Sequence, residues 1–94
     1  MQVLSGHSKD VIIVNKRGLH ARASAKFVTT AAAMNGCKVI VAKDGNEALG
    51  ASILGLMMLG AAKGDTVTVS VEGESAPERL AELVALVEAG FGED

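Results

Sequence analysis

The stretch that decides the fold runs from Val11 to Val28 and reads VIIVNKRGLHARASAKFV. Its nearly continuous apolar start predicts a strand at about residues 10–15 that is either central in the sheet or strongly covered. The alanine-rich residues that follow have helical spacing and predict a helix over about 21–34. Gly18 permits the sharp turn between the two elements. The stretch is therefore predicted to be strand, turn and helix.

His20 falls at the start of this predicted helix, where free backbone N–H groups and the helix dipole favour an anion. Arg22 adds a cation two residues on. A neutral imidazole is a nucleophile near pH 7, and a phosphoryl group attached to it would be stabilised by the helix end and the guanidinium. Two interpretations stay open: a phosphoryl acceptor, or a histidine that only caps the helix beside a solvated arginine.

Composition limits the classes of function. The 94 residues suit one small domain, and 49% hydrophobic residues suffice for a core that must be aliphatic, since Phe27 and Phe91 are the only aromatic residues. The chain has few aromatic side chains for base stacking and a net charge of -2, and both features argue against a nucleic-acid-binding protein. No run is long enough to span a membrane. Cys37 is the single cysteine, so an intrachain disulfide and a cysteine metal site are excluded, and we expect a cytoplasmic protein. The two histidines are far apart in sequence and no phosphate-binding loop is present, so we expect neither a metal nor a cofactor.

Charge is segregated along the chain. From Val11 to Lys43 there is no acidic residue, whereas from Asp65 onward there are eight acids against one base, Arg79. A basic patch around His20 would suit an anionic ligand or acidic partner proteins. The alternative is a chance segregation of solvated charges. The bases of the first segment are Lys16, Arg17, Arg22, Lys26, Lys38 and Lys43.

The remaining elements follow from local patterns. Asp44-Gly45 predicts a hairpin turn. Apolar and polar residues alternate over Thr66–Val71, which predicts a half-buried strand. Residues 75–78 have the pattern of a capping box, with proline in the first turn of the helix that follows. The order β-α-β-β-α-β-α predicts an α/β (α+β) two-layer open-faced sandwich, with a four-stranded antiparallel sheet and three helices on one face. The other predicted elements are strands at 37–43 and 46–49, and helices at 50–60 and 76–89, the last burying Leu80, Leu83, Val84 and Val87. Residues 1–9 are expected to be a leader, 10–94 a single domain, and 91–94 to fray.

The predicted helix at 50–60 is apolar almost all the way round. Leu56 and Leu59 can bury one face, which leaves at least some of its other apolar side chains exposed. An exposed apolar patch usually marks a contact surface; the alternative is that a larger core covers it. The side chains in question are Ile53, Leu54 and Met57.

The chain contains three motifs in order: GLHAR at 18–22 leading into AKFV at 25–28, ASILGLMMLG at 51–60, and KGD at 63–65. Together they resemble the HPr family, the histidine-containing phosphocarriers of the bacterial phosphoenolpyruvate-dependent phosphotransferase system. The resemblance extends from about Val11 to Val87. It implies that His20 is phosphorylated on Nδ1 by enzyme I and passes the phosphoryl group to a IIA-type protein or domain. It also implies that Arg22 contacts the phosphate, and that the protein is a stoichiometric carrier rather than an enzyme.

The resemblance also implies a docking surface and a regulatory site. Ile53, Leu54 and Met57 match the apolar patch that docks on both partners, with Lys26 at its rim. Ser52 matches the serine that an HPr kinase/phosphorylase modifies, although a plain helix cap would serve the same position. The alternative function is a regulatory binding module controlled by phosphorylation at His20 or Ser52. A monomer is expected in either case.

One position departs from the family pattern. Proline commonly follows the site arginine, whereas this chain has Ala23. Proline in a first helical turn stiffens the start of the helix. Alanine at this position would therefore change the lifetime of the phosphohistidine and the choice of partner. It leaves the nucleophile and the arginine in place.

Overall fold

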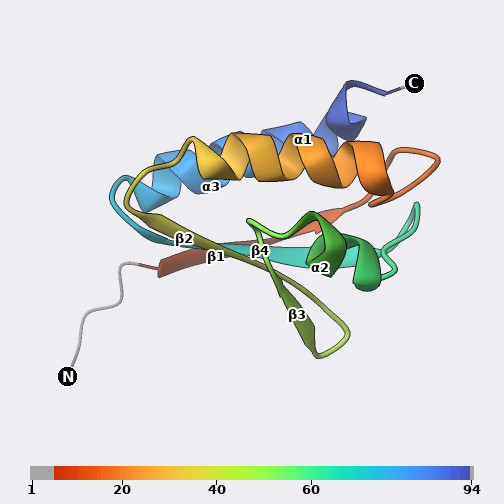
Figure 1. Ribbon diagram of the computed structural model, residues 1–94, viewed down its shortest axis with the longest axis horizontal. Coiled ribbons are helices and arrows are strands. Elements are labelled where there is room, and N and C mark those ends of the chain that lie inside the picture. Colours follow the sequence, from red (N-terminus) through yellow and green to blue (C-terminus); the bar gives the residue numbers. More distant parts are fainter. Residues whose placement is uncertain (1–5, 94) are drawn as a thin grey trace.

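The computed structural model describes residues 6–93 (Figure 1). Four strands, three helices and a short 3₁₀ turn follow one another in the predicted order. Within the described residues no helix has the length and apolar character needed to cross a membrane. The elements are β1 (Gly6–Ile12), α1 (Ala21–Ala32), β2 (Cys37–Lys43), β3 (Asn46–Leu49), α2 (Ile53–Met58), β4 (Thr66–Gly73), α3 (Ala76–Glu88) and η1 (Gly90–Gly92).

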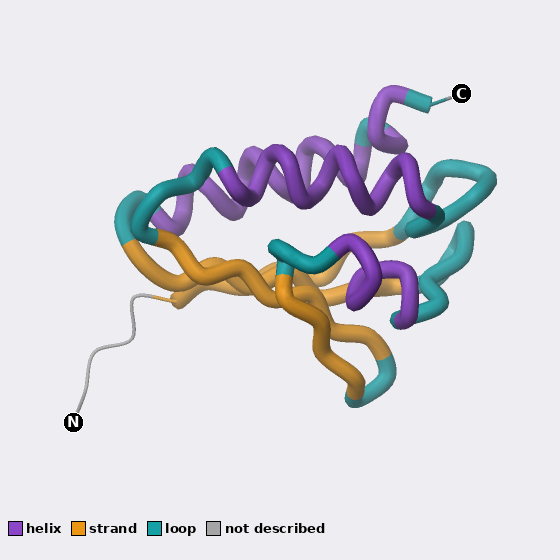
Figure 2. Tube along the Cα trace, in the orientation of Figure 1, coloured by secondary structure: helices purple, strands orange, loops and turns teal. Residues whose placement is uncertain are grey.

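The strands form one antiparallel sheet in the order β1-β4-β2-β3. Helices α1 and α3 lie together over one face of it, and α2 lies beside the sheet near the start of α1 (Figures 1 and 2). The predicted two-layer sandwich is therefore confirmed. The start of α1 and the C-terminal end of α3 lie at the same end of the molecule (Figure 1).

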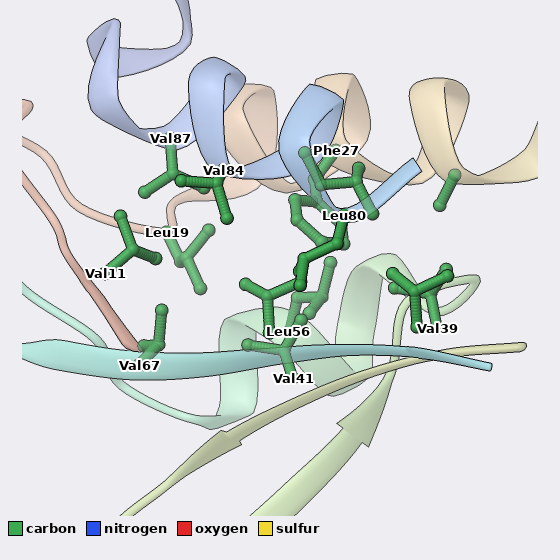
Figure 3. Packing of buried hydrophobic residues seen from close by; sticks show 14 of the residues in the cluster. Val11, Leu19, Phe27, Val39, Val41, Leu56, Val67, Leu80, Val84 and Val87 are labelled. Atoms are coloured by element: carbon green, nitrogen blue, oxygen red, sulfur yellow. The ribbon is translucent and has the colours of Figure 1, made fainter. Parts of the chain in front are cut away.

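The core lies between the two long helices and the covered face of the sheet (Figure 3). The predicted alternation of β4 is confirmed, because every second residue from Val67 to Val71 is buried. Phe27 of α1, Leu80 of α3 and Leu56 of α2 belong to the same buried cluster as these valines. All four apolar residues predicted on α3 are buried: Leu80, Leu83, Val84 and Val87.

The first strand differs from the prediction. β1 begins at Gly6 rather than near residue 10. It lies at the edge of the sheet, and all of its residues except Val11 are exposed, so it is neither central nor strongly covered. The apolar run continues beyond the strand as an alternating segment, in which Val11 and Ile13 are buried while Ile12 and Val14 are exposed. Residues 6–9 of the expected leader are part of β1, and residues 1–5 lie outside the described chain.

One predicted turn and one predicted helix cap are confirmed. Asp44 and Gly45 both have positive φ, as a tight hairpin between β2 and β3 requires. Ser52 is the N-cap of α2, and its Oγ accepts a hydrogen bond from the N–H of Gly55 at 2.9 Å.

The predicted capping box at residues 75–78 is wrong. Ser75 precedes α3 in the left-handed conformation, with φ of 55°, and its side chain makes no capping hydrogen bond. Pro77 does lie in the first turn of α3, where its missing N–H costs nothing. The local pattern identified the start of the helix and missed the backbone conformation that leads into it.

The expectation that residues 91–94 fray is also wrong for the part that is described. Phe91 is only 1% exposed and belongs to the hydrophobic core. Gly90, Phe91 and Gly92 have φ of 64°, 57° and 75°, so three successive left-handed residues turn the chain after α3. This turn brings the tail over the start of α1.

Candidate functional site

The loop before α1 is fixed on two sides. Gly18, with φ of 63°, packs directly on the backbone of Ala61, and the N–H of Leu19 donates to the carbonyl oxygen of Ala61 at 3.0 Å. Asn15 is buried, and its Nδ2 donates to the carbonyl oxygen of Gly18 at 2.9 Å. The loop therefore places the next residue, His20, in a defined position.

His20 is the N-cap of α1, as the sequence predicted. Its Nδ1 accepts a hydrogen bond from the backbone N–H of Arg22 at 3.3 Å. Its Nε2 lies 2.7 Å from Oε2 of Glu93. The side chain is 19% exposed, so part of the ring remains open to a partner. The start of α1 thus holds Nδ1 of His20 next to the backbone N–H of Arg22, at the positive end of the helix dipole.

Glu93 reaches the histidine from the other end of the chain. Its Oε1 accepts a hydrogen bond from Nδ2 of Asn15 at 3.0 Å. Burial alone would raise the pKa of Glu93, but the hydrogen bonds from Asn15 and His20, together with the nearby charge of Lys26, outweigh it and lower that pKa below its usual value. The carboxyl group is therefore held in its charged form.

A pocket of about 380 Å³ lies next to this pair. Four basic side chains line it, and Glu93 supplies the one carboxylate among the lining residues. The predicted basic patch is confirmed in part, because Lys38 and Lys43 of β2 do not line this pocket. Cations gathered beside a helix N-terminus favour an anionic group at this place. The lining residues are Lys16, Arg17, Arg22, Lys26, Gly92 and Glu93.

The predicted apolar patch lies on α2. Ile53, Leu54 and Met57 are 41%, 67% and 39% exposed, and the neighbouring Met58 is 77% exposed. Leu56 alone on this helix is buried. Helix α2 packs against α1, and the chain that leaves α2 meets the His20 loop at Ala61. The patch and the histidine therefore belong to one end of the molecule.

Two further predicted residues have defined surroundings. Nζ of Lys26 donates to the carbonyl oxygen of Phe91 at 2.7 Å, so its ammonium group holds the C-terminal turn. Ser52 is half-buried at the start of α2, with its Oγ engaged by Gly55. Ala23 is fully buried, and α1 begins at Ala21 without a proline in its first turn.

The sequence reasoning missed Asn15 and Glu93. Glu93 contacts His20 and Asn15 across 73 and 78 positions of sequence, which no local pattern reports. The hydrogen bond from Asn15 to Gly18 spans only three positions. One signal was available: Phe91 is one of two aromatic residues in the chain and stands between two glycines close to the end. A large apolar residue at that position suggests an anchored tail.

Known proteins resemble this chain over most of its length. A family model for the PTS HPr component phosphorylation site matches residues 7–89. A phosphocarrier protein HPr of Neisseria meningitidis serogroup A is 42% identical over 85 residues, covering 90% of this chain and 94% of that protein. A phosphocarrier protein NPr of Shewanella violacea is 38% identical over 85 residues, covering 90% and 92%. The crystal structure of HPr-C-His from Thermoanaerobacter tengcongensis has a TM-score of 0.87 and 40% identity, covering 94% of this chain and 98% of that one.

Proposed function

Because the chain belongs to the HPr family of phosphocarrier proteins, we propose that His20 accepts a phosphoryl group from phospho-enzyme I and passes it to a IIA-type protein or domain. The observation that supports this most directly is the position of Nδ1. It lies at the N-terminus of α1 and 3.3 Å from the N–H of Arg22, beside a pocket lined by four basic side chains.

The transfer needs little from the carrier itself. The lone pair of Nδ1 attacks phosphorus while the bond between phosphorus and the donor nitrogen breaks, and the donor imidazole keeps that electron pair. The phosphoryl group then bears about two negative charges. Arg22 and the free N–H groups of α1 stabilise them. Delivery to the acceptor reverses these steps and frees His20. The protein is itself the phosphoryl acceptor in the first transfer and the donor in the second, so it acts as a stoichiometric carrier.

Partner docking is assigned to α2. Ile53, Leu54 and Met57 expose apolar surface next to the His20 loop, and burying it against a partner would contribute the hydrophobic part of the affinity. Lys26 lines the pocket beside Glu93, and its charge would favour an acidic partner there. We expect the carrier to act as a monomer in the cytoplasm.

The test is phosphorylation by enzyme I and phosphoenolpyruvate, followed by measurement of acid-labile phosphate. The chain offers a matched control, since it has only two histidines. His20→Ala should abolish the label, and His7→Ala, in exposed strand β1, should retain it. Label that survives in His20→Ala would overturn the assignment.

A second candidate function is a regulatory binding module. The supporting observation is that Ser52 lies directly before the exposed α2 patch. A phosphate on Ser52 would be tolerated at the helix start, yet would place two negative charges on a surface that meets acidic partners. Incubation with an HPr kinase and ATP should label the wild-type protein and leave Ser52→Ala unlabelled. An unlabelled wild type would remove this function.

A further inference from the structure

The two ring nitrogens of His20 have partners of opposite kind. The backbone N–H of Arg22 can only donate, so Nδ1 must accept. The carboxylate of Glu93 can only accept, so Nε2, 2.7 Å away, must donate. Together these contacts select the tautomer with its proton on Nε2 and its lone pair on Nδ1.

Glu93 is itself held from two directions. Asn15, only 2% exposed, donates to Oε1 and so aims Oε2 at the histidine. The chain before Glu93 is fixed by the buried ring of Phe91 and by the hydrogen bond from Lys26 to the Phe91 carbonyl oxygen. A carboxylate anchored in this way orients an imidazole as the aspartate of a Ser-His-Asp triad does.

We propose that Glu93 is a positioning residue for His20, which keeps the ring proton on Nε2 and thereby reserves Nδ1 for the phosphoryl group. This inference rests on the proposed phosphoryl transfer. When Nδ1 bonds to phosphorus, the Nε2 proton stays in place and the ring gains a positive charge. Glu93 faces that charge, whereas the other charged side chains lining the site are cations: Lys16, Arg17, Arg22 and Lys26.

The alternative is that Glu93 only fastens the tail. The two roles are separated by the state of the ring, since tail attachment alone would leave the tautomer unchanged. Glu93→Gln keeps the size of the side chain and removes its charge, and its amide can present either a donor or an acceptor to Nε2. Glu93→Ala removes the charge and every hydrogen-bonding group of the side chain. Glu88→Gln, at the exposed end of α3, is the matched control.

The first measurement is the ¹⁵N spectrum of the His20 ring at pH 8, in the full-length unphosphorylated protein, where no partner is needed. The wild type and Glu88→Gln should show one dominant tautomer with Nε2 protonated. Glu93→Gln and Glu93→Ala should show a several-fold larger share of the other tautomer. Ring spectra identical to wild type in both Glu93 variants would overturn the proposal.

The second measurement uses phosphoramidate as a small donor, from which ammonia leaves as the phosphorus–histidine bond forms. Phosphorus NMR then reports which ring nitrogen carries the group. The wild type should be labelled on Nδ1, and the Glu93 variants should carry a several-fold larger share on Nε2. An unchanged distribution would contradict the proposal. Failure of enzyme I to label His20 would instead contradict the proposed function, and the tautomer result would still stand.

Discussion

Gly18 and Ala61 meet backbone to backbone. A Cβ atom on Gly18 would lie 2.2 Å from the carbonyl oxygen of Ala61, and the same oxygen accepts the N–H of Leu19. This contact joins the loop that carries His20 to the segment that leaves α2. The loop that carries His20 and the apolar patch of α2 are thus joined through main-chain atoms, which do not change rotamer as side chains do.

Replacing Gly18 by alanine should therefore be costly. A left-handed conformation alone costs a non-glycine residue about 1–2 kcal/mol, and the overlap with Ala61 adds to it. We expect the free energy of unfolding to fall by more than about 2 kcal/mol. Gly45→Ala is the control, because its φ is also positive but no atom lies within 4 Å of the added Cβ. Equal losses in urea unfolding would contradict the close contact.

Arg22→Ala should slow phosphoryl transfer without unfolding the protein. Arg22 is exposed and lines the pocket beside His20. A charged hydrogen bond contributes about 1.5–3 kcal/mol, which corresponds to a rate about tenfold to a hundredfold lower. The measurement is the rate of transfer from phospho-enzyme I, with Lys38→Ala on β2 as a control outside the pocket. A rate equal to that of the control would remove Arg22 from the mechanism.

Leu54→Ser should weaken docking and spare the fold. The side chain is 67% exposed, so little buried surface is lost in the free protein. Removing an apolar anchor from an interface costs more than about 1 kcal/mol, and we expect the Kd for enzyme I to rise about tenfold in calorimetric titration. Leu49→Ser on β3 is the control, since that leucine is also 55% exposed but lies outside α2. If both variants bind alike, α2 is not the docking surface.

Leu56→Ala should show the opposite behaviour on the same helix. Leu56 is fully buried between α2 and the core, and its truncation leaves a cavity. Such substitutions cost about 2–5 kcal/mol. Met58→Ala, at a side chain 77% exposed, should change the free energy of unfolding by less than about 0.5 kcal/mol. Denaturant titration of both variants checks the assignment of the buried face.

The stability that the contacts of Glu93 with His20 and Asn15 contribute should depend on pH. The pKa of Glu93 is lowered in the folded protein, so its contribution to stability is complete above the ordinary glutamate pKa of about 4.3 and is lost as the pH falls through the lower folded value. We therefore expect wild type to have a higher Tm than Glu93→Gln at pH 7, and the difference to vanish in acid. A Tm difference that persists at about pH 2 would contradict the ionised contact.

Most of the fold could be predicted from local pattern. The alternation of Thr66–Val71 and the helical spacing from Leu80 to Val87 both reflect which side faces the core, and the structure confirms both. The position of β1 could not be predicted, because an apolar run does not report the order of strands in a sheet. His20 at a helix start followed from Gly18 and the residues after it. Glu93 did not, because its contact depends on the complete tertiary fold.

The turn at Gly90–Gly92 has a practical consequence for anyone who modifies this protein. A purification tag or fluorescent reporter fused after Asp94 would leave the chain one residue beyond the carboxylate that contacts His20, and its bulk would lie beside the pocket where we propose that a partner docks. Strand β1 begins at Gly6, at the opposite end of the molecule from the start of α1 (Figure 1). Labels for activity assays therefore belong at the amino terminus.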